Sequence, residues 1–200
     1  MSTARIEPYD FESARRETAG VSTVTGNNKT RMTRTPDRTL VLVRHAKSSW
    51  DNTNLADHDR QLNERGERDA PLMAERFARR GPRPDRVISS SAFRALSTAE
   101  EFVAALELDS GALVVTREVY EASERELMEL ISQLDDGLGC VMVVGHNPTL
   151  THVANELADD PVGDLPTCSV VTLALPSAHW ADAKRGAFEL VDFDFPKRGD

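Results

Sequence analysis

The fold of this 200-residue chain is decided by the stretch Thr39-Leu40-Val41-Leu42-Val43-Arg44-His45. Four consecutive apolar side chains stand between polar neighbours, which is typical of a strand buried on both faces. A parallel strand of this kind delivers Arg44 and His45 to the carboxyl edge of a sheet, where open α/β sheets bind their ligands. The alternative is a strand that ends in two solvated polar residues, and this segment alone does not decide between the two.

Further strands alternate with helices along the chain. Apolar runs predict strands near 86–90, 112–117, 140–144, 169–175 and 187–193, and helical periodicity predicts helices near 64–80, 92–107, 124–135 and 149–158. Phe93 is expected on the buried face of the second helix, and residues 119–122 are expected to form a connector. The last two strands have no helix between them and can pair antiparallel. The order therefore predicts a three-layer α/β/α sandwich with a mostly parallel, mixed sheet.

The composition fits one domain with a polar extension. Hydrophobic residues make up 40% and charged residues 28% of the chain, as in ordinary globular proteins. Residues 1–38 are polar and lack periodicity, which predicts a flexible N-terminal extension, although they could instead pack on the domain or mediate an oligomer. The domain is expected at 39–195 and a loose tail at 196–200.

Charge and hydropathy exclude several classes of partner. The net charge of −9 disfavours a nucleic-acid binder. No apolar run is long enough to span a membrane, and residues 1–20 contain no apolar core of a secretory signal. The two cysteines, Cys140 and Cys168, are not spaced like metal ligands, so we expect a reducing, cytoplasmic location. The sequence does not indicate an oligomeric state.

Three predicted strands end near residues that suit phosphoryl transfer. Arg94 lies in the first turn of the helix that follows the second strand, and His146 follows the fourth strand. If these strands are parallel, both groups meet Arg44 and His45 at one edge. The guanidinium groups of Arg44 and Arg94 would bind the phosphoryl oxygens. A neutral His45 would attack phosphorus with a ring nitrogen, and His146 would donate a hydrogen bond to a phosphoryl oxygen. Surface ion pairing of the arginines is the alternative.

A metal site is the competing interpretation of the histidines. His45, His58 and His146 could in principle act as ligands, but the flanking arginines would repel a metal cation. The sequence therefore predicts no metal and no cofactor.

Three motifs resemble those of the histidine phosphatase superfamily, which includes the phosphoglycerate mutases. Arg44-His45-Ala46-Lys47-Ser48 resembles its Arg-His-Gly signature. Ser89-Ser90-Ser91-Ala92-Phe93-Arg94-Ala95 resembles its second arginine motif, and Gly145-His146-Asn147-Pro148 its second histidine motif. The order agrees over residues 40–158. The Asp57-His58-Asp59-Arg60 loop and the lack of helical insertions look most like the SixA-like phosphohistidine phosphatases.

The resemblance implies a phosphoglycerate mutase-like fold and roles for five residues. It makes His45 the residue that is phosphorylated, with Arg44, Arg94 and His146 completing the pocket. Glu121 stands at about the position of the proton donor of mutase-like members, although it could equally be a solvated residue near a helix start.

Four further residues are candidates for substrate contacts: Ser48, Asp51, Arg60 and Asn147. Ser48 could donate to phosphate or only structure its turn. Asp51 sits where mutases often carry an asparagine, and its charge would repel phosphate unless it is paired, for example with Arg60 or Lys47. Ala46 replaces the usual glycine, which is tolerable if its φ is negative.

The sequence thus predicts a metal-independent phosphatase that hydrolyses a phosphomonoester or a protein phosphohistidine through a covalent intermediate on His45. Its partner would be a phosphorylated protein or a small phosphorylated metabolite. A small-molecule phosphatase or mutase is the first alternative, and a non-catalytic phosphate-binding domain is the second.

Overall fold

The structure, a computed structural model, describes residues 38–50 and 55–198. Apart from Arg38, the predicted N-terminal extension lies outside the described residues, and so does Asp51. The elements are β1 (Arg38–Arg44), η1 (Asp57–Asp59), α2 (Glu64–Arg80), β2 (Arg86–Ser90), α3 (Phe93–Ala105), η2 (Ser110–Ala112), β3 (Leu113–Thr116), α4 (Arg117–Glu121), α5 (Glu124–Ser132), β4 (Cys140–Gly145), α6 (Thr149–Leu157), β5 (Val170–Leu175), η3 (Trp180–Asp182) and β6 (Glu189–Asp194).

The six strands form one mixed sheet in the order β3-β2-β4-β1-β5-β6. Strands β1 to β4 run parallel to one another, whereas β5 is antiparallel to β1 and β6 is antiparallel to β5. The predicted mixed sheet is therefore confirmed. Since β1 and β4 are central neighbours, their carboxyl ends lie side by side.

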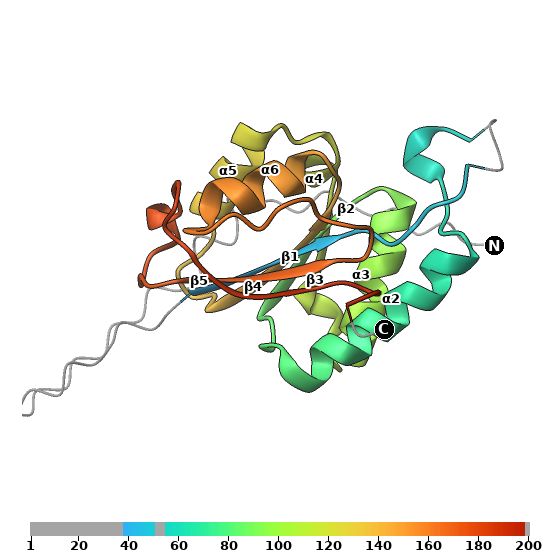
Figure 1. Cartoon of the computed structure of the whole chain (residues 1–200), viewed down its shortest axis with the longest axis horizontal. Helices are drawn as coiled ribbons and strands as arrows, with labels where there is room; N and C mark the ends of the chain where they lie inside the picture. Colours follow the sequence, from blue (N-terminus) through green and yellow to red (C-terminus); the bar gives the residue numbers. More distant parts are fainter. Residues whose placement is uncertain (1–37, 51–54, 199–200) are drawn as a thin grey trace, which may run out of the picture. The chain divides into compact units, whose positions relative to one another are not determined.

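Helices cover both faces of this sheet, as Figure 1 shows, with α4, α5 and α6 above it and α2 and α3 below it. Successive side chains of β1 point to opposite faces of the sheet, and a hydrophobic core lies on each face. Leu40 and Leu42 pack with the side of α5 and α6, and Val41 and Val43 pack with the side of α2 and α3. All four are fully buried, each contributing about 1.5–3 kcal/mol. This confirms the predicted three-layer sandwich.

Local signals set the helix starts. The Asn63 side chain accepts a hydrogen bond from the Gly66 N–H and so caps α2. A Cβ atom on Gly66 would lie 2.1 Å from the Lys47 carbonyl oxygen, so glycine permits the close approach of α2 to the segment after β1. A capping box of Ser123 and Glu126 opens α5.

Two local predictions were wrong. Phe93 is 46% exposed because the buried face of α3 is formed by Arg94, Ala95, Thr98, Ala99 and Phe102, and Phe93 lies about 100° round the helix from Arg94. The expected connector at 119–122 is largely the short helix α4, which Thr116 caps by accepting from the Glu118 N–H. In the described part of the chain, no helix is both long and apolar enough to cross a membrane.

Candidate active site

The parallel register of β1 and β4 brings two imidazoles together. Arg44 pairs with Gly145 in the sheet, so the next residues, His45 and His146, leave adjacent strands at the same edge. Their ring centroids are 5.0 Å apart. The predicted meeting of the two histidines is therefore observed.

His45 presents one nitrogen as an acceptor. Its Nδ1 atom lies 2.7 Å from the Ala46 carbonyl oxygen, and because a carbonyl can only accept, Nδ1 carries the proton and Nε2 keeps its lone pair. The Nε–H group of Arg94 lies 3.4 Å from that Nε2 atom. Burial, helped by the charges of Arg94, Arg44 and Arg60 and opposed by the bond to Ala46, lowers the pKa of His45 to about 4. The imidazole is therefore neutral at neutral pH.

The backbone after His45 is fixed from α3. The Ala46 N–H donates to Thr98 Oγ1 at 3.0 Å, and the same hydroxyl donates to the Arg94 carbonyl oxygen at 2.7 Å. Ala46 is not among the described residues with positive φ, so the glycine of the related motif is not required here. Thr98 thus joins the strand end that carries His45 to the helix turn that carries Arg94.

Arg94 is buried and is paired with Asp57 from the loop after β1. Its Nη2 atom lies 2.9 Å from Asp57 Oδ2, and its Nη1–H donates to the Asp57 carbonyl oxygen at 2.5 Å. Arg60 donates to Asp57 Oδ1 at 2.9 Å, and the Tyr120 hydroxyl donates to Oδ2 at 3.1 Å. Although burial by itself raises the pKa of Asp57, hydrogen bonds from Arg60 and Arg94, the charge of Arg94 and the Tyr120 bond together lower it to about 2.

His146 is held by the end of β2. Its Nε2 atom lies 2.6 Å from the hydroxyl oxygen of the fully buried Ser90. Its Nδ1 atom is buried and has no hydrogen-bond partner among the described residues. Burial first, and then the charges of His45 and Arg94, lower the pKa of His146 to about 3. The ring is therefore neutral at neutral pH, and its unpartnered nitrogen is enclosed by the protein.

Arg44 reaches toward the segment after α6. Its Nη1–H donates to the Leu165 carbonyl oxygen at 2.5 Å, while its buried Nε has no partner among the described residues. Burial lowers the pKa of Arg44, and the negative charge of Asp164 opposes this effect. Arg44 is thus oriented by a backbone carbonyl and balanced by a nearby carboxylate.

Arg60 contacts three residues that follow β1. It donates to Ser48 Oγ at 2.8 Å and to the Ser49 carbonyl oxygen at 3.0 Å, and its guanidinium stacks 3.3 Å from the centre of the Trp50 ring. The Ser48 hydroxyl is buried and engaged by Arg60, which supports the expectation that Ser48 structures its turn.

The other predicted residues lie in different surroundings. Asn147 donates through Nδ2 to the Leu165 carbonyl oxygen at 3.1 Å, so its amide faces the segment that holds Arg44. Glu121 forms an exposed ion pair with Arg117 at 3.0 Å. Its neighbour Tyr120 contacts the site instead, through Asp57 and through an edge-on ring contact with His146, with centroids 5.6 Å apart.

Sequence reasoning missed Tyr120 and the pairing role of Asp57. Thr116 is the one local signal near Tyr120, because a threonine at this position can begin a helix, as it does for α4. Asp57 was noticed only as part of a polar loop. Its spacing of three residues from Arg60 would have suggested the ion pair now seen.

Together these groups can bind an oxyanion and attack it. Arg44, Arg94 and Arg60 supply positive charge, His45 Nε2 supplies a lone pair, and His146 lies beside it. Within residues 38–50 and 55–198, no group of three or more His, Cys, Asp or Glu side chains is arranged to hold a metal ion.

Comparison with known proteins gives a consistent picture. Residues 40–116 match the model of the histidine phosphatase superfamily, branch 1. An uncharacterized protein of Mycobacterium tuberculosis is 34% identical over 165 residues, which cover 78% of this chain and all of that protein.

Two solved structures share the architecture. A protein of Agrobacterium tumefaciens, provisionally named phosphohistidine phosphatase SixA, is 29% identical with a TM-score of 0.65, over 78% of this chain and 97% of that one. The protein histidine phosphatase SixA in complex with tungstate has a TM-score of 0.65 at 21% identity, over 81% of this chain and 99% of that one, and shows the same fold.

Proposed function

The chain belongs to the histidine phosphatase superfamily, in its SixA-like branch, and we propose that this phosphatase works without a metal ion through a covalent phosphohistidine on His45. The observation that carries the proposal is the His45 ring itself. Its Nδ1 donates to Ala46 and its Nε2 faces the Arg94 guanidinium. A neutral imidazole held in one tautomer is a ready nucleophile.

The first step transfers the phosphoryl group to the enzyme. The lone pair of His45 Nε2 forms a bond to phosphorus while the bond from phosphorus to the leaving group breaks, and the leaving group keeps that electron pair. Arg44 and Arg94 bind the equatorial oxygens, where negative charge accumulates. The ring of His146 lies beside His45 and donates to a phosphoryl oxygen once it is protonated by the approach of the anion.

The second step hydrolyses the intermediate. Water attacks phosphorus, the N–P bond breaks, its electron pair returns to His45 Nε2, and the water proton leaves with inorganic phosphate. The arginines stabilise this transition state as they do the first one. The Nδ1–H bond to Ala46 persists through both steps, so the ring keeps its orientation.

The charge state of Asp57 favours a phosphohistidine substrate. Asp57 is the carboxylate that reaches Arg94, and with a pKa of about 2 it is ionised at neutral pH. It is therefore a poor acid for an alkoxide leaving group, which must gain a proton. Imidazole leaves more easily, so a phosphoryl group bound to nitrogen places less demand on the site. The SixA-like relatives are named for such substrates.

The nucleophile is tested by trapping the intermediate. Wild-type protein and His45→Ala are incubated with p-nitrophenyl phosphate, with His152→Ala as the matched control, since His152 is exposed and pairs with Glu124 on the outside of α6. We expect turnover and an acid-labile, base-stable phosphoenzyme in wild type and His152→Ala. We expect at least about a thousandfold loss of turnover in His45→Ala. Equal turnover in all three would refute the assignment.

The substrate class is tested by leaving group. Rates are compared on a phosphohistidine peptide, p-nitrophenyl phosphate and an alkyl phosphate such as glycerol phosphate. We expect the first two to be hydrolysed much faster than the third, because an alkoxide needs the proton that ionised Asp57 does not supply. Preference for the alkyl phosphate would instead indicate a metabolite phosphatase.

A further inference from the structure

Three polar side chains on helix α6 and just before it bond to the same neighbouring segment of the chain. Thr151 and Asn155 lie four residues apart on one face of α6, and Asn147 lies two residues before the helix. All three bond to the segment 163–165, which lies between α6 and β5. We call Asn147, Thr151 and Asn155 the polar row.

The polar row fixes segment 163–165 at both ends. Asn155 donates to the Gly163 carbonyl oxygen at 2.9 Å and accepts from the Gly163 N–H at 3.0 Å. Gly163 has φ +86°, a conformation that suits glycine, and no neighbour within 4 Å crowds it. Thr151 Oγ1 accepts from the Leu165 N–H at 3.2 Å. Asn147 donates to the Leu165 carbonyl oxygen at 3.1 Å.

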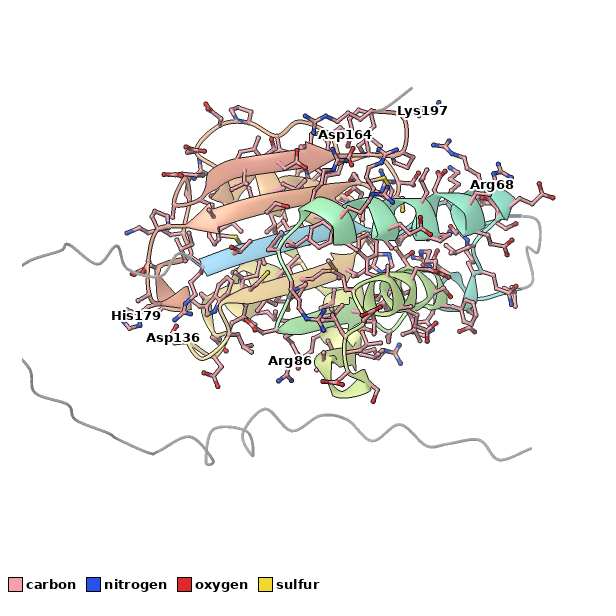
Figure 2. All side chains as sticks on the ribbon, turned by 90° about the horizontal axis from the view of Figure 1, so that it is seen from below. Arg68, Arg86, Asp136, Asp164, His179 and Lys197 are labelled. Carbon is pink, nitrogen blue, oxygen red and sulfur yellow. The ribbon has the colours of Figure 1, made fainter. Side chains whose placement is uncertain are left out.

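The Leu165 peptide is the point where this row meets the active site. The carbonyl oxygen that accepts from Asn147 also accepts from Arg44 Nη1. The Leu165 side chain is fully buried, so its packing in the core also helps to fix the position of this peptide. Asp164, labelled in Figure 2, is 3.4 Å from Thr151 Oγ1 and 3.4 Å from Asn147 Nδ2, and its charge acts on Arg44.

From these contacts we propose that the polar row is a positioning device for Arg44, so that Thr151 and Asn155 set phosphate affinity without touching phosphate. The proposal rests on the proposed function, in which Arg44 binds the phosphoryl group. An arginine has several rotatable bonds, and a single backbone acceptor at a fixed place selects one of its conformations. If segment 163–165 shifts, the Arg44 guanidinium shifts with it, and small displacements of such groups have large effects on binding and rate.

Thr151 offers the sharpest test because it can be changed without changing shape. Thr151→Val removes the hydroxyl, Thr151→Ser keeps it, and Thr149→Val is the matched control. Thr149 lies on the same helix, and its hydroxyl donates to the Ala122 carbonyl oxygen at 3.1 Å. Replacing it with valine removes a comparable bond that does not involve segment 163–165. Inorganic phosphate binding is measured by titration calorimetry, and thermal unfolding is measured on the same samples.

We expect Thr151→Val to weaken phosphate binding about five- to tenfold, as one lost hydrogen bond to an ordered segment would. Thr151→Ser and Thr149→Val should stay within about twofold of wild type. Asn155→Ala, at a half-buried position, should weaken binding in the same direction and serves if Thr151→Val does not fold. A fall in unfolding temperature with unchanged phosphate affinity in these two variants would overturn the proposal.

A double-mutant cycle with Arg44→Lys separates this proposal from the proposed function. If the row acts through Arg44, Thr151→Val should have little further effect on phosphate affinity in the Arg44→Lys background. If Arg44→Lys weakens binding but Thr151→Val adds its full effect to it, the row does not act through Arg44. If Arg44→Lys itself leaves affinity unchanged, the phosphate role of Arg44 fails, and with it the pocket on which the function was proposed.

Discussion

The Nε atom of Arg94 lies 3.4 Å from Nε2 of His45, the nitrogen that keeps its lone pair. Burial is the main reason that the pKa of the His45 ring is lowered, and a guanidinium so close to the imidazole acts in the same direction. The same arginine is also bonded to Asp57 through both terminal nitrogens. Arg94 therefore links the attacking atom to the carboxylate of the loop, and several measurable properties depend on this link.

The first prediction concerns acid stability. The folded protein holds His45 at a pKa of about 4 and His146 at about 3, below the unperturbed value near 6.5. Below pH 6.5 the unfolded chain therefore binds protons that the folded chain does not, and stability falls as pH drops from about 6.5 to 4. We expect each ring to contribute a loss on the order of 2 kcal/mol by pH 4.5, measured by urea unfolding at pH 7, 5.5 and 4.5.

His45→Asn and His146→Asn are the controls for this prediction. Each variant should flatten the pH dependence between 6.5 and 4, since asparagine does not titrate. Ring resonances of both histidines, followed by NMR, should not titrate above pH 5.5. A midpoint near 6.5 for either ring would show that its burial is lost in solution.

The second prediction concerns the charge of Asp57. Its carboxylate sits on Arg94 and Arg60, where an incoming phosphate dianion would meet like charge. Asp57→Asn removes this charge and keeps the side-chain shape. We expect inorganic phosphate to bind about fivefold more tightly or better, because repulsion between near charges at a protein surface is worth about 1 kcal/mol or more. Titration calorimetry at two salt concentrations should show the gain shrinking as salt rises.

Asp59→Asn is the matched variant, because it also removes a carboxylate from the short helix η1. Among the described residues, the Asp59 carboxylate pairs only with the ring of His58. It should change phosphate affinity less. If Asp57→Asn weakens binding, the role of Asp57 in holding Arg94 outweighs its repulsion of phosphate.

The third prediction separates Glu121 from Tyr120. The Glu121 carboxylate pairs with Arg117 in solvent, so Glu121→Gln should leave kcat on p-nitrophenyl phosphate within about twofold. The Tyr120 hydroxyl reaches Asp57, so Tyr120→Phe should change kcat or KM more than Glu121→Gln does. A large loss of kcat in Glu121→Gln, greatest on substrates with poor leaving groups, would restore Glu121 as the proton donor.

The sequence was sufficient for features that depend on strand ends. Arg44-His45 and Gly145-His146 each follow an apolar run, and parallel pairing of those runs leaves little freedom in where the next residues go. The paired rings of His45 and His146 could therefore be predicted, as could the three layers.

The remaining features depend on contacts that are distant along the chain. The sequence could place Arg94 on a helix. Its ion pair with Asp57, however, joins residues 37 positions apart and depends on the conformation of a polar loop. The hydrogen bond from Arg44 to the Leu165 carbonyl oxygen joins residues 121 positions apart. Its acceptor is a backbone atom, so no pattern of side chains in the sequence predicts it. Choosing Tyr120 over Glu121 required the phase of a five-residue helix, and so short a helix shows no periodicity.

The last prediction concerns Thr98, whose hydroxyl joins the Ala46 N–H to the Arg94 carbonyl oxygen inside the core. Thr98→Val has the same shape but leaves the buried Ala46 N–H without its acceptor, which costs about 1–3 kcal/mol. For a chain of this size the unfolding temperature should fall by roughly 2–10 °C. Thr98→Ser keeps the hydroxyl and should lose less.

Because Ala46 also anchors the His45 ring through its carbonyl oxygen, kcat measured well below the transition should fall further in Thr98→Val than in Thr98→Ser. Equal stability and equal kcat in the two variants would mean that packing of the methyl group, and not the hydroxyl, is what residue 98 contributes.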